Sequence, residues 1–218
     1  MGGNYHSTDD LPGVLPVLPL TGVLLLPRGQ LPLNIFEPRY LAMVDAAMSG
    51  NRLIGMVQPT EHEDTTLTPK LSAIGCAGRI TGYRETEDGR YLITLTGICR
   101  FRITAEEQTQ LPFRLVKADF RPFASDLADV NEQDFPRERL LTALRDYLTR
   151  RDLKADWQSM LSAPAETLVN SLAMLCPFDP AEKQALLEAP AWSERVDILI
   201  ALLEMAIAAK PGTPPSVN

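Results

Sequence analysis

The stretch LPVLPLTGVLLLPRGQLPLNIFEPRYLAMVDAAM, residues 15–48, decides the fold. Its first half contains two apolar runs separated by Thr21-Gly22 and is interrupted by four prolines, Pro16, Pro19, Pro27 and Pro32. Because each proline removes a backbone donor, such segments suit the edges or bulges of a sheet better than its centre. The pattern therefore predicts two short strands, the first ending near Leu20 and the second covering Val23 to Leu26.

The second half of this stretch predicts a helix. Glu37-Pro38 opens it, since proline at the first helical position loses no intrahelical hydrogen bond. Apolar side chains then recur at helical spacing, at Tyr40, Leu41, Val44, Ala47 and Met48, and Gly50 is a natural stop. Edge-type strands followed by a short amphipathic helix are expected at the start of a compact β-rich domain.

Residues 91–103 carry the most regular pattern in the chain. One set of alternate positions is apolar or small and comprises Tyr91, Ile93, Leu95, Gly97, Cys99, Phe101 and Ile103. The intervening set comprises Leu92, Thr94, Thr96, Ile98, Arg100 and Arg102. A period of two predicts one long, curved strand, preceded by a hairpin turn at Asp88-Gly89. Because Gly97 keeps the register on both sides, we expect a bend or a close backbone approach there rather than a bulge.

Shorter strands are predicted at residues 53–57, 74–83 and 116–120, the last ended by Pro122. Long, bent strands with one apolar face suit a small, partly closed barrel. We therefore expect residues 13–123 to form a β-rich domain that contains one helix.

The composition changes after Phe123. Residues 124–131, ASDLADVN, are expected to be a linker, and residues 132–210 carry only helical signals. Apolar stripes and caps predict helices near Leu140 to Leu148, near Trp157, from Pro164, from Pro180 with a capping box on Asp179, and from Ser193. Several amphipathic helices with short links predict an all-α bundle. Residues 1–12 and 211–218 are expected to be flexible tails.

The opening stretch also resembles the amino-terminal substrate-binding domain of Lon proteases. The likeness lies in the LPVLPL run, the second Pro-Leu and the helix with Arg39-Tyr40, and it continues through residues 53–59, 74–84 and 95–103. It covers most of residues 14–123, and the remainder is similar to the helical second half of free-standing Lon-domain proteins. The resemblance implies an α+β fold, with a PUA-like barrel before the bundle. It also implies non-catalytic binding of polypeptides or protein partners, as in an adaptor for protein quality control.

The modules that make a Lon protease an enzyme cannot be placed in this sequence. There is no G-x-x-x-x-G-K-[ST] loop to hold nucleotide phosphates, no serine beside a lysine in a recognisable nucleophile context, and no G-x-S-x-G elbow. The sequence therefore predicts a binding protein with no cofactor, and an unrecognised hydrolase is the weakest alternative. His62 lies in the acidic loop Glu61-His62-Glu63-Asp64, which we interpret as a solvated surface and not as a metal site. Cys76 and Cys99 are expected to be buried, inert thiols.

The overall composition narrows the class of protein further. The 218 residues carry 21 basic and 28 acidic side chains, a net charge of −7, which argues against nucleic-acid or anionic-membrane binding. No apolar run approaches the roughly 20 residues that span a bilayer, and the first residues lack the features of a secretory signal. Three widely spaced cysteines then favour a reduced, cytoplasmic protein.

Two groups of residues are candidates for partner binding. The first is Phe36, Glu37, Arg39 and Tyr40, where the Pro-rich edge meets the helix; Glu37 and Arg39 could pair, and an edge near Leu31 to Phe36 could accept an extended peptide. The second is a stripe with Arg100 and Arg102 on the outward face of the long strand. Core packing and solvated arginines are the alternative interpretations. A small-molecule or nucleic-acid binder using the barrel mouth and this stripe is the alternative function. The partner and the oligomeric state are not set by the sequence.

Overall fold

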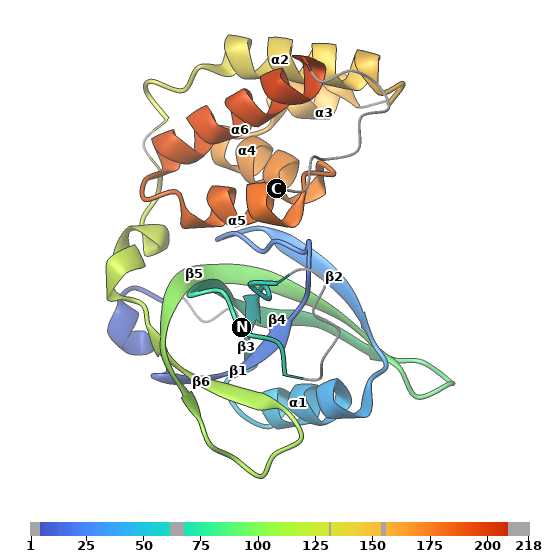
Figure 1. Ribbon diagram of the computed structural model, residues 1–218, viewed down its shortest axis with the longest axis vertical. Helices are drawn as coiled ribbons and strands as arrows, with labels where there is room; N and C mark the ends of the chain where they lie inside the picture. Colours follow the sequence, from blue (N-terminus) through green and yellow to red (C-terminus); the bar gives the residue numbers. More distant parts are fainter. Residues whose placement is uncertain (1–4, 62–67, 131, 154–155, 209–218) are drawn as a thin grey trace.

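The computed structural model describes residues 5–61, 68–130, 132–153 and 156–208. Figure 1 shows a curled sheet with one helix, α1, at one end of the molecule and the helices α2 to α6 at the other. The chain is therefore a mixed α+β protein. The predicted acidic loop around His62 lies largely outside the described residues.

The strands are β1 (Val14–Pro19), β2 (Gln30–Ile35), β3 (Leu53–Val57), β4 (Ile74–Glu85), β5 (Tyr91–Glu107) and β6 (Arg114–Asp119). The helices are α1 (Pro38–Met48), α2 (Arg137–Arg150), α3 (Trp157–Ser162), α4 (Ala165–Leu175), α5 (Pro180–Glu188) and α6 (Trp192–Ala208). Two 3-10 segments, η1 (Thr8–Asp10) and η2 (Arg121–Leu127), complete the described elements.

The described strands form one six-strand sheet in the order β2-β5-β4-β3-β1-β6. The long strand β5 pairs with β4 from Tyr91 to Arg102 and with β2 from Tyr91 to Thr96, and its far end pairs with β6. Since β6 pairs with β1 as well, the sheet curls back toward itself. The predicted long strand over residues 91–103 is confirmed and extends to Glu107.

Gly97 lies where the backbone of another segment comes close. A Cβ atom on Gly97 would be 2.0 Å from the carbonyl oxygen of Leu26, so only glycine fits. The expected close approach is therefore present. A register shift accompanies it, because Gly97 pairs with Gly78 and Cys99 pairs with Ala77, which leaves Ile98 as an extra residue. The sequence pattern did not favour this bulge.

The second strand was predicted at Val23 to Leu26 but is observed later in the chain, at Gln30–Ile35. Residues 23–26 form no regular element, although Leu24, Leu25 and Leu26 are buried, and the strand is β2. The run instead fills the core as an irregular segment that ends in a turn at Arg28, whose φ is 61°. The helix α1 begins and ends as predicted, and the capping box of α5 is present. α6 starts at Trp192, one residue before the predicted cap at Ser193.

The part of residues 1–12 that the structure describes is packed and does not form a loose tail. Ser7 caps η1, Leu11 is buried in the core, and the Tyr5 hydroxyl accepts a hydrogen bond from Arg79. Within the described ranges, none of the helices combines the length and apolar character needed to cross a bilayer.

The sheet and the later helices share one hydrophobic cluster and several hydrogen bonds. The connecting bonds run from Gln58 to the Pro180 carbonyl (3.1 Å), from Asn170 to the Pro27 carbonyl (2.9 Å), from Lys183 to the Gly22 carbonyl (2.9 Å) and from Gln184 to the Ile74 carbonyl (3.2 Å). In three of these bonds an amide or ammonium group of the helices donates to a backbone carbonyl of the β-rich half, and in the fourth Gln58 of the β-rich half donates to the start of α5.

Candidate functional site

Two cavities of about 580 Å³ each contain residues that the sequence singled out. The first, called here the junction cavity, lies between the sheet and the helices and contains Arg100. The second, called here the α1 hollow, lies at the start of α1 and contains Arg39 and Tyr40. Both volumes are within the roughly 300–1,000 Å³ of typical ligand sites.

Arg100 is not on an exposed stripe, and this part of the prediction is wrong. Its side chain is only 2% exposed, and its Nε and Nη2 donate to the two carboxylate oxygens of Asp126, at 2.9 and 2.8 Å. Its Nη1 donates to the carbonyls of Leu187 and Ala189, at 3.0 and 2.5 Å. These carbonyls lie at the carboxyl end of α5, where the helix dipole favours a positive charge.

The burial of Arg100 results from segments that are distant in sequence. The strand alternation is as predicted, with Arg100 opposite Cys99 and Phe101, but η2 and α5 cover this outward face. Asp126 lies in the segment that was expected to be a linker, and the backbone N–H of Arg100 also donates to it, at 2.9 Å. The alternative small-molecule or nucleic-acid binder therefore loses one of the two arginines named for it, while Arg102 remains exposed.

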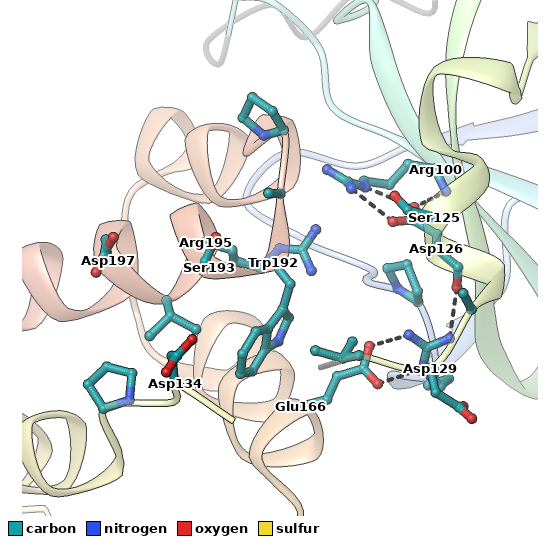
Figure 2. Close-up of a pocket in the computed structure, with 18 residues that line it drawn as sticks. Arg100, Ser125, Asp126, Asp129, Asp134, Glu166, Trp192, Ser193, Arg195 and Asp197 are labelled. Atoms are coloured by element: carbon teal, nitrogen blue, oxygen red, sulfur yellow. Dashed lines mark hydrogen bonds and ion pairs between the residues drawn. The ribbon is translucent and has the colours of Figure 1, made fainter. Parts of the chain in front are cut away.

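One wall of the junction cavity contains a second ion pair, between Arg28 and Glu166. Arg28 binds Glu166 of α4 through two hydrogen bonds, of which the Nε to Oε2 bond is 2.7 Å, and its Nη1 donates to the carbonyl of Asp126 at 2.7 Å. Figure 2 shows Glu166 of this pair on one side of the cavity and the first turn of α6 on the other. The cavity is thus bounded by charged groups from both halves of the chain.

Arg195 and Trp192 enter the junction cavity from α6 (Figure 2). Arg195 is 2% exposed, and its Nε donates to the Leu186 carbonyl at 3.0 Å. Its Nη2 and the Nε1 of Trp192 have no hydrogen-bond partner within the described structure. Burial, and next the positive charge of Arg100, lower the pKa of Arg195 to about 10. Neither side chain is among the predicted site residues, because an arginine in an amphipathic helix is usually solvated and a tryptophan there usually packs against other helices.

The α1 hollow brings together two of the predicted residues. Arg39 pairs with Glu37 at 2.9 Å, and its guanidinium carbon lies 4.4 Å from the centre of the Tyr40 ring. The predicted Glu37–Arg39 pair is therefore present. Tyr40 is buried, and burial raises the pKa of its hydroxyl above the ordinary value. Cation–π contact of this kind fixes the arginine over the ring.

The rest of the α1 hollow combines apolar walls with a charged rim. The apolar side comprises Val17, Pro19, Leu111, Pro112 and Phe113, and the charged side comprises Glu106, Glu107 and Arg114. Arg114 is held by two hydrogen bonds to Glu106, of 3.0 and 2.6 Å, and by a 2.6 Å bond to the Pro69 carbonyl. The rim is therefore fixed. On the apolar side Leu111 and Pro112 are exposed, whereas Val17 and Phe113 are buried.

The remaining two candidate residues line neither cavity. Phe36 precedes α1 and is 62% exposed, so its ring is available at the surface. Arg102 is exposed on β5, where it lies opposite Asp119 of β6 in the strand register. The residues that line the α1 hollow with Arg39 do not include it.

The described residues offer little reactive chemistry. Cys76, Cys99 and Cys176 are buried and free, and burial raises the pKa of Cys99 to about 12 and that of Cys176 to about 11. Such thiols stay protonated at neutral pH and are poor nucleophiles. Among the residues that the structure covers, no three His, Cys, Asp or Glu side chains gather in a way that could hold a metal ion.

Comparison with known proteins gives one family. The family described as "ATP-dependent protease La (LON) substrate-binding domain" matches residues 14–205. The Lon protease of Desulfosudis oleivorans is 33% identical over 98 residues, which cover 44% of this chain and 12% of that protein. The Lon protease of Escherichia coli K12 is 26% identical over 198 residues, which cover 88% of this chain and 25% of that protein. The chain thus spans about a quarter or less of the length of these relatives.

Two solved structures share the fold. The N-terminal domain of a Lon protease from the Mycobacterium avium complex superposes with a TM-score of 0.61 at 18% identity, covering 88% of this chain and 98% of that one. A Lon N-terminal domain protein from Xanthomonas campestris gives a TM-score of 0.59 at 22% identity, covering 86% and 97%.

Proposed function

We propose that this chain, which belongs to the family of ATP-dependent protease La (LON) substrate-binding domains, binds polypeptide segments or protein partners without catalysing a reaction. In this proposal it is a cytoplasmic adaptor in protein quality control that holds a bound chain for other proteins to process. The family description, which names substrate binding, supports the general role. Since a fold alone does not fix a function, the proposal also needs a suitable surface.

The proposal treats the chain as two cooperating parts. Residues 13–123 would be a partly closed, PUA-like barrel, and residues 132–210 an all-helical bundle. The pairing of β6 with both β1 and β5 supports the first part, and the packing of α2 against α6 supports the second. The hydrogen bonds between the two parts would hold them at a fixed angle while a polypeptide is bound.

The observation that carries the proposal is the α1 hollow. An extended polypeptide presents apolar side chains and backbone polar groups together, and the hollow offers both kinds of contact. Leu111 and Pro112 would receive an apolar side chain, and Arg39 would face a carbonyl or carboxylate of the bound segment. The exposed ring of Phe36 would extend the same apolar surface along the start of α1.

The edge of β2 is a weaker docking site than the sequence suggested. β2 pairs with β5 and, in the described part of the chain, with no other strand. The N–H of Gly97 donates to the Gly29 carbonyl, and the antiparallel register continues from this pair. The backbone N–H and C=O groups of the odd-numbered residues of β2 therefore point toward β5. Those of the even-numbered residues, including the backbone of Pro32, point toward the free edge. A proline on the free edge interrupts the row of donors that an added strand would need. We therefore assign polypeptide binding to the α1 hollow.

The test is a binding titration with a permanently unfolded polypeptide. Fluorescein-labelled, reduced and carboxymethylated lactalbumin would be titrated with the full chain and followed by fluorescence anisotropy. Leu111→Ser removes an exposed apolar contact of the hollow without changing its rim. Losing the burial of about one leucine should weaken binding roughly tenfold. Phe36→Ser should also weaken binding of the labelled polypeptide.

The matched control is Leu153→Ser. Leu153, like Leu111, is a half-exposed leucine outside helices and strands, but it lies beyond α2 and does not line the hollow. This variant should bind as the parent does. Absence of binding by the parent chain would refute the proposed function. Equal binding by the Leu111 and Leu153 variants would keep the function and refute the site.

A further inference from the structure

The junction cavity contains buried hydrogen-bond donors for which the described residues supply no acceptor. They are Nη2 of Arg195 and Nε1 of Trp192, which come from the first turn of α6. Figure 2 shows both side chains pointing from α6 into the space that Arg100 and Asp126 border. Folded proteins rarely leave buried donors unsatisfied, so a site with two of them indicates a missing acceptor.

The charges in the buried part of the cavity also leave a positive excess. Arg100 and Arg195 are both buried, and Asp126 is the buried carboxylate between the two halves. Both oxygens of Asp126 accept hydrogen bonds from Arg100, while Arg195 donates only to a carbonyl among the bonds described above. Although burial lowers the pKa of Arg195 to about 10, its guanidinium stays charged at neutral pH. An anionic acceptor would balance this charge.

The rim of the cavity limits which anion can enter. Asp129, Asp134 and Asp197 line it, and Glu166 lies on the wall with Arg28. An acidic rim repels ligands that carry several negative charges, such as nucleic acids or polyphosphates. The same rim attracts a cationic nitrogen. The ligand that fits has a single anionic group for the interior and a positive charge for the entrance.

We propose that the junction cavity binds a carboxylate on Arg195 and Trp192, carried by a ligand whose cationic nitrogen faces Asp129, Asp134 and Asp197. Two sources have this chemistry, a free basic amino acid and the C-terminal end of a peptide with a basic last residue. A carboxylate can accept from a guanidinium and an indole N–H at once. This site is separate from the α1 hollow and does not depend on it.

The test uses the indole of Trp192 as a reporter. The chain has two tryptophans, so Trp157→Phe leaves Trp192 as the single one. The full chain with this change would be titrated with L-arginine, with L-argininamide, and with a penta-glycyl-arginine peptide as free acid and as amide. The free acids should change Trp192 emission saturably, and the amides should bind about tenfold or more weakly, because they lack the charged acceptor.

The same titration distinguishes the two possible ligands, a free basic amino acid and the C-terminal end of a peptide. Saturation by L-arginine but not by the peptide acid identifies a free amino acid as the ligand. Tighter saturation by the peptide acid identifies a chain end. Both outcomes support the carboxylate site. An equal response to acid and amide, or no saturable response to either acid, overturns it.

Two variants test the donors by calorimetry, which needs no reporter. Arg195→Gln removes the charge, and Trp192→Phe removes one N–H but keeps an aromatic ring; each should weaken binding of the free acids about tenfold. The control is Arg139→Gln, an exposed arginine of α2 that pairs with Glu204 outside the cavity. The proposal is overturned if the Trp192 variant and a folded Arg195 variant both bind the free acids as tightly as the parent does. If Arg195→Gln fails to fold, the Trp192 variant and the amide probes decide.

Discussion

Replacing Asp126 with asparagine should destabilise the protein strongly. Asp126 is the carboxylate of a pair in which both side chains are buried, at 2% and 6% exposure. Asparagine has nearly the same shape but no charge, and its NH2 group would face the guanidinium of Arg100. Removing one partner of a buried pair typically costs about 3–5 kcal/mol, because the other charge remains without compensation. For a chain of this length that corresponds to a fall in Tm of roughly 6–20 °C.

The assay is urea unfolding followed by far-UV circular dichroism, with a thermal melt as a second measurement. Asp119→Asn is the matched control, because Asp119 also binds an arginine, Arg121, but on the surface. Solvent replaces such a contact readily, so the control should unfold almost where the parent does. A double variant with Arg100→Met and Asp126→Leu should be more stable than Asp126→Asn, since it removes both charges.

The reasoning would be refuted if the Asp126 and Asp119 variants lost similar amounts of stability. It would also be refuted if the double variant were the least stable of the three. The first result would mean that water reaches the Arg100 guanidinium and replaces the carboxylate. The second would mean that the apolar replacements cost more than the uncompensated charge.

Two further perturbations follow from other parts of the structure. Gly97→Ala places a Cβ atom 2.0 Å from the Leu26 carbonyl and should cost at least about 1–3 kcal/mol in urea unfolding, whereas Gly13→Ala meets no atom within 4 Å and should cost less. Burial raises the pKa of Cys176 to about 11 from an ordinary 9.0, so its contribution to stability is full below pH 9 and is lost as the pH rises toward 11. The parent should therefore lose about 2 kcal/mol more than Cys176→Ala across this interval, and parallel pH profiles would contradict that assignment.

Local patterns in the sequence were sufficient for several of the individual elements, though not for the position of the second strand. The alternation over residues 91–103 predicted most of β5, and Glu37-Pro38 located the start of α1. The capping box at Asp179 located the start of α5. Each of these signals depends on residues within one or two turns or on one strand, so a single sequence contains them in full.

The environment of Arg100 could not be read in the same way. The alternation over residues 91–103 only indicates that Arg100 lies on the face of β5 opposite Cys99 and Phe101. Whether this face of the strand is exposed to water depends on segments much later in the chain. Asp126 lies in a polar stretch whose composition is that of a loop, and nothing nearby marks it as buried. The same limit applies to the α1 hollow, where Tyr40 was anticipated but Leu111 and Phe113 were not.

The contacts of Arg100 have a consequence for how the protein is made. Its partners follow it by 26 residues at Asp126 and by 87 and 89 residues at the Leu187 and Ala189 carbonyls. While the ribosome is still translating α5, β5 carries a charge whose final hydrogen-bond acceptors have not yet been synthesised. Because contacts over such separations form late, the strands should remain open to chaperones and proteases until the last helices emerge. A nascent chain that stalls before α5 would therefore lack two of the carbonyl acceptors of Arg100 and would leave this face of β5 uncovered.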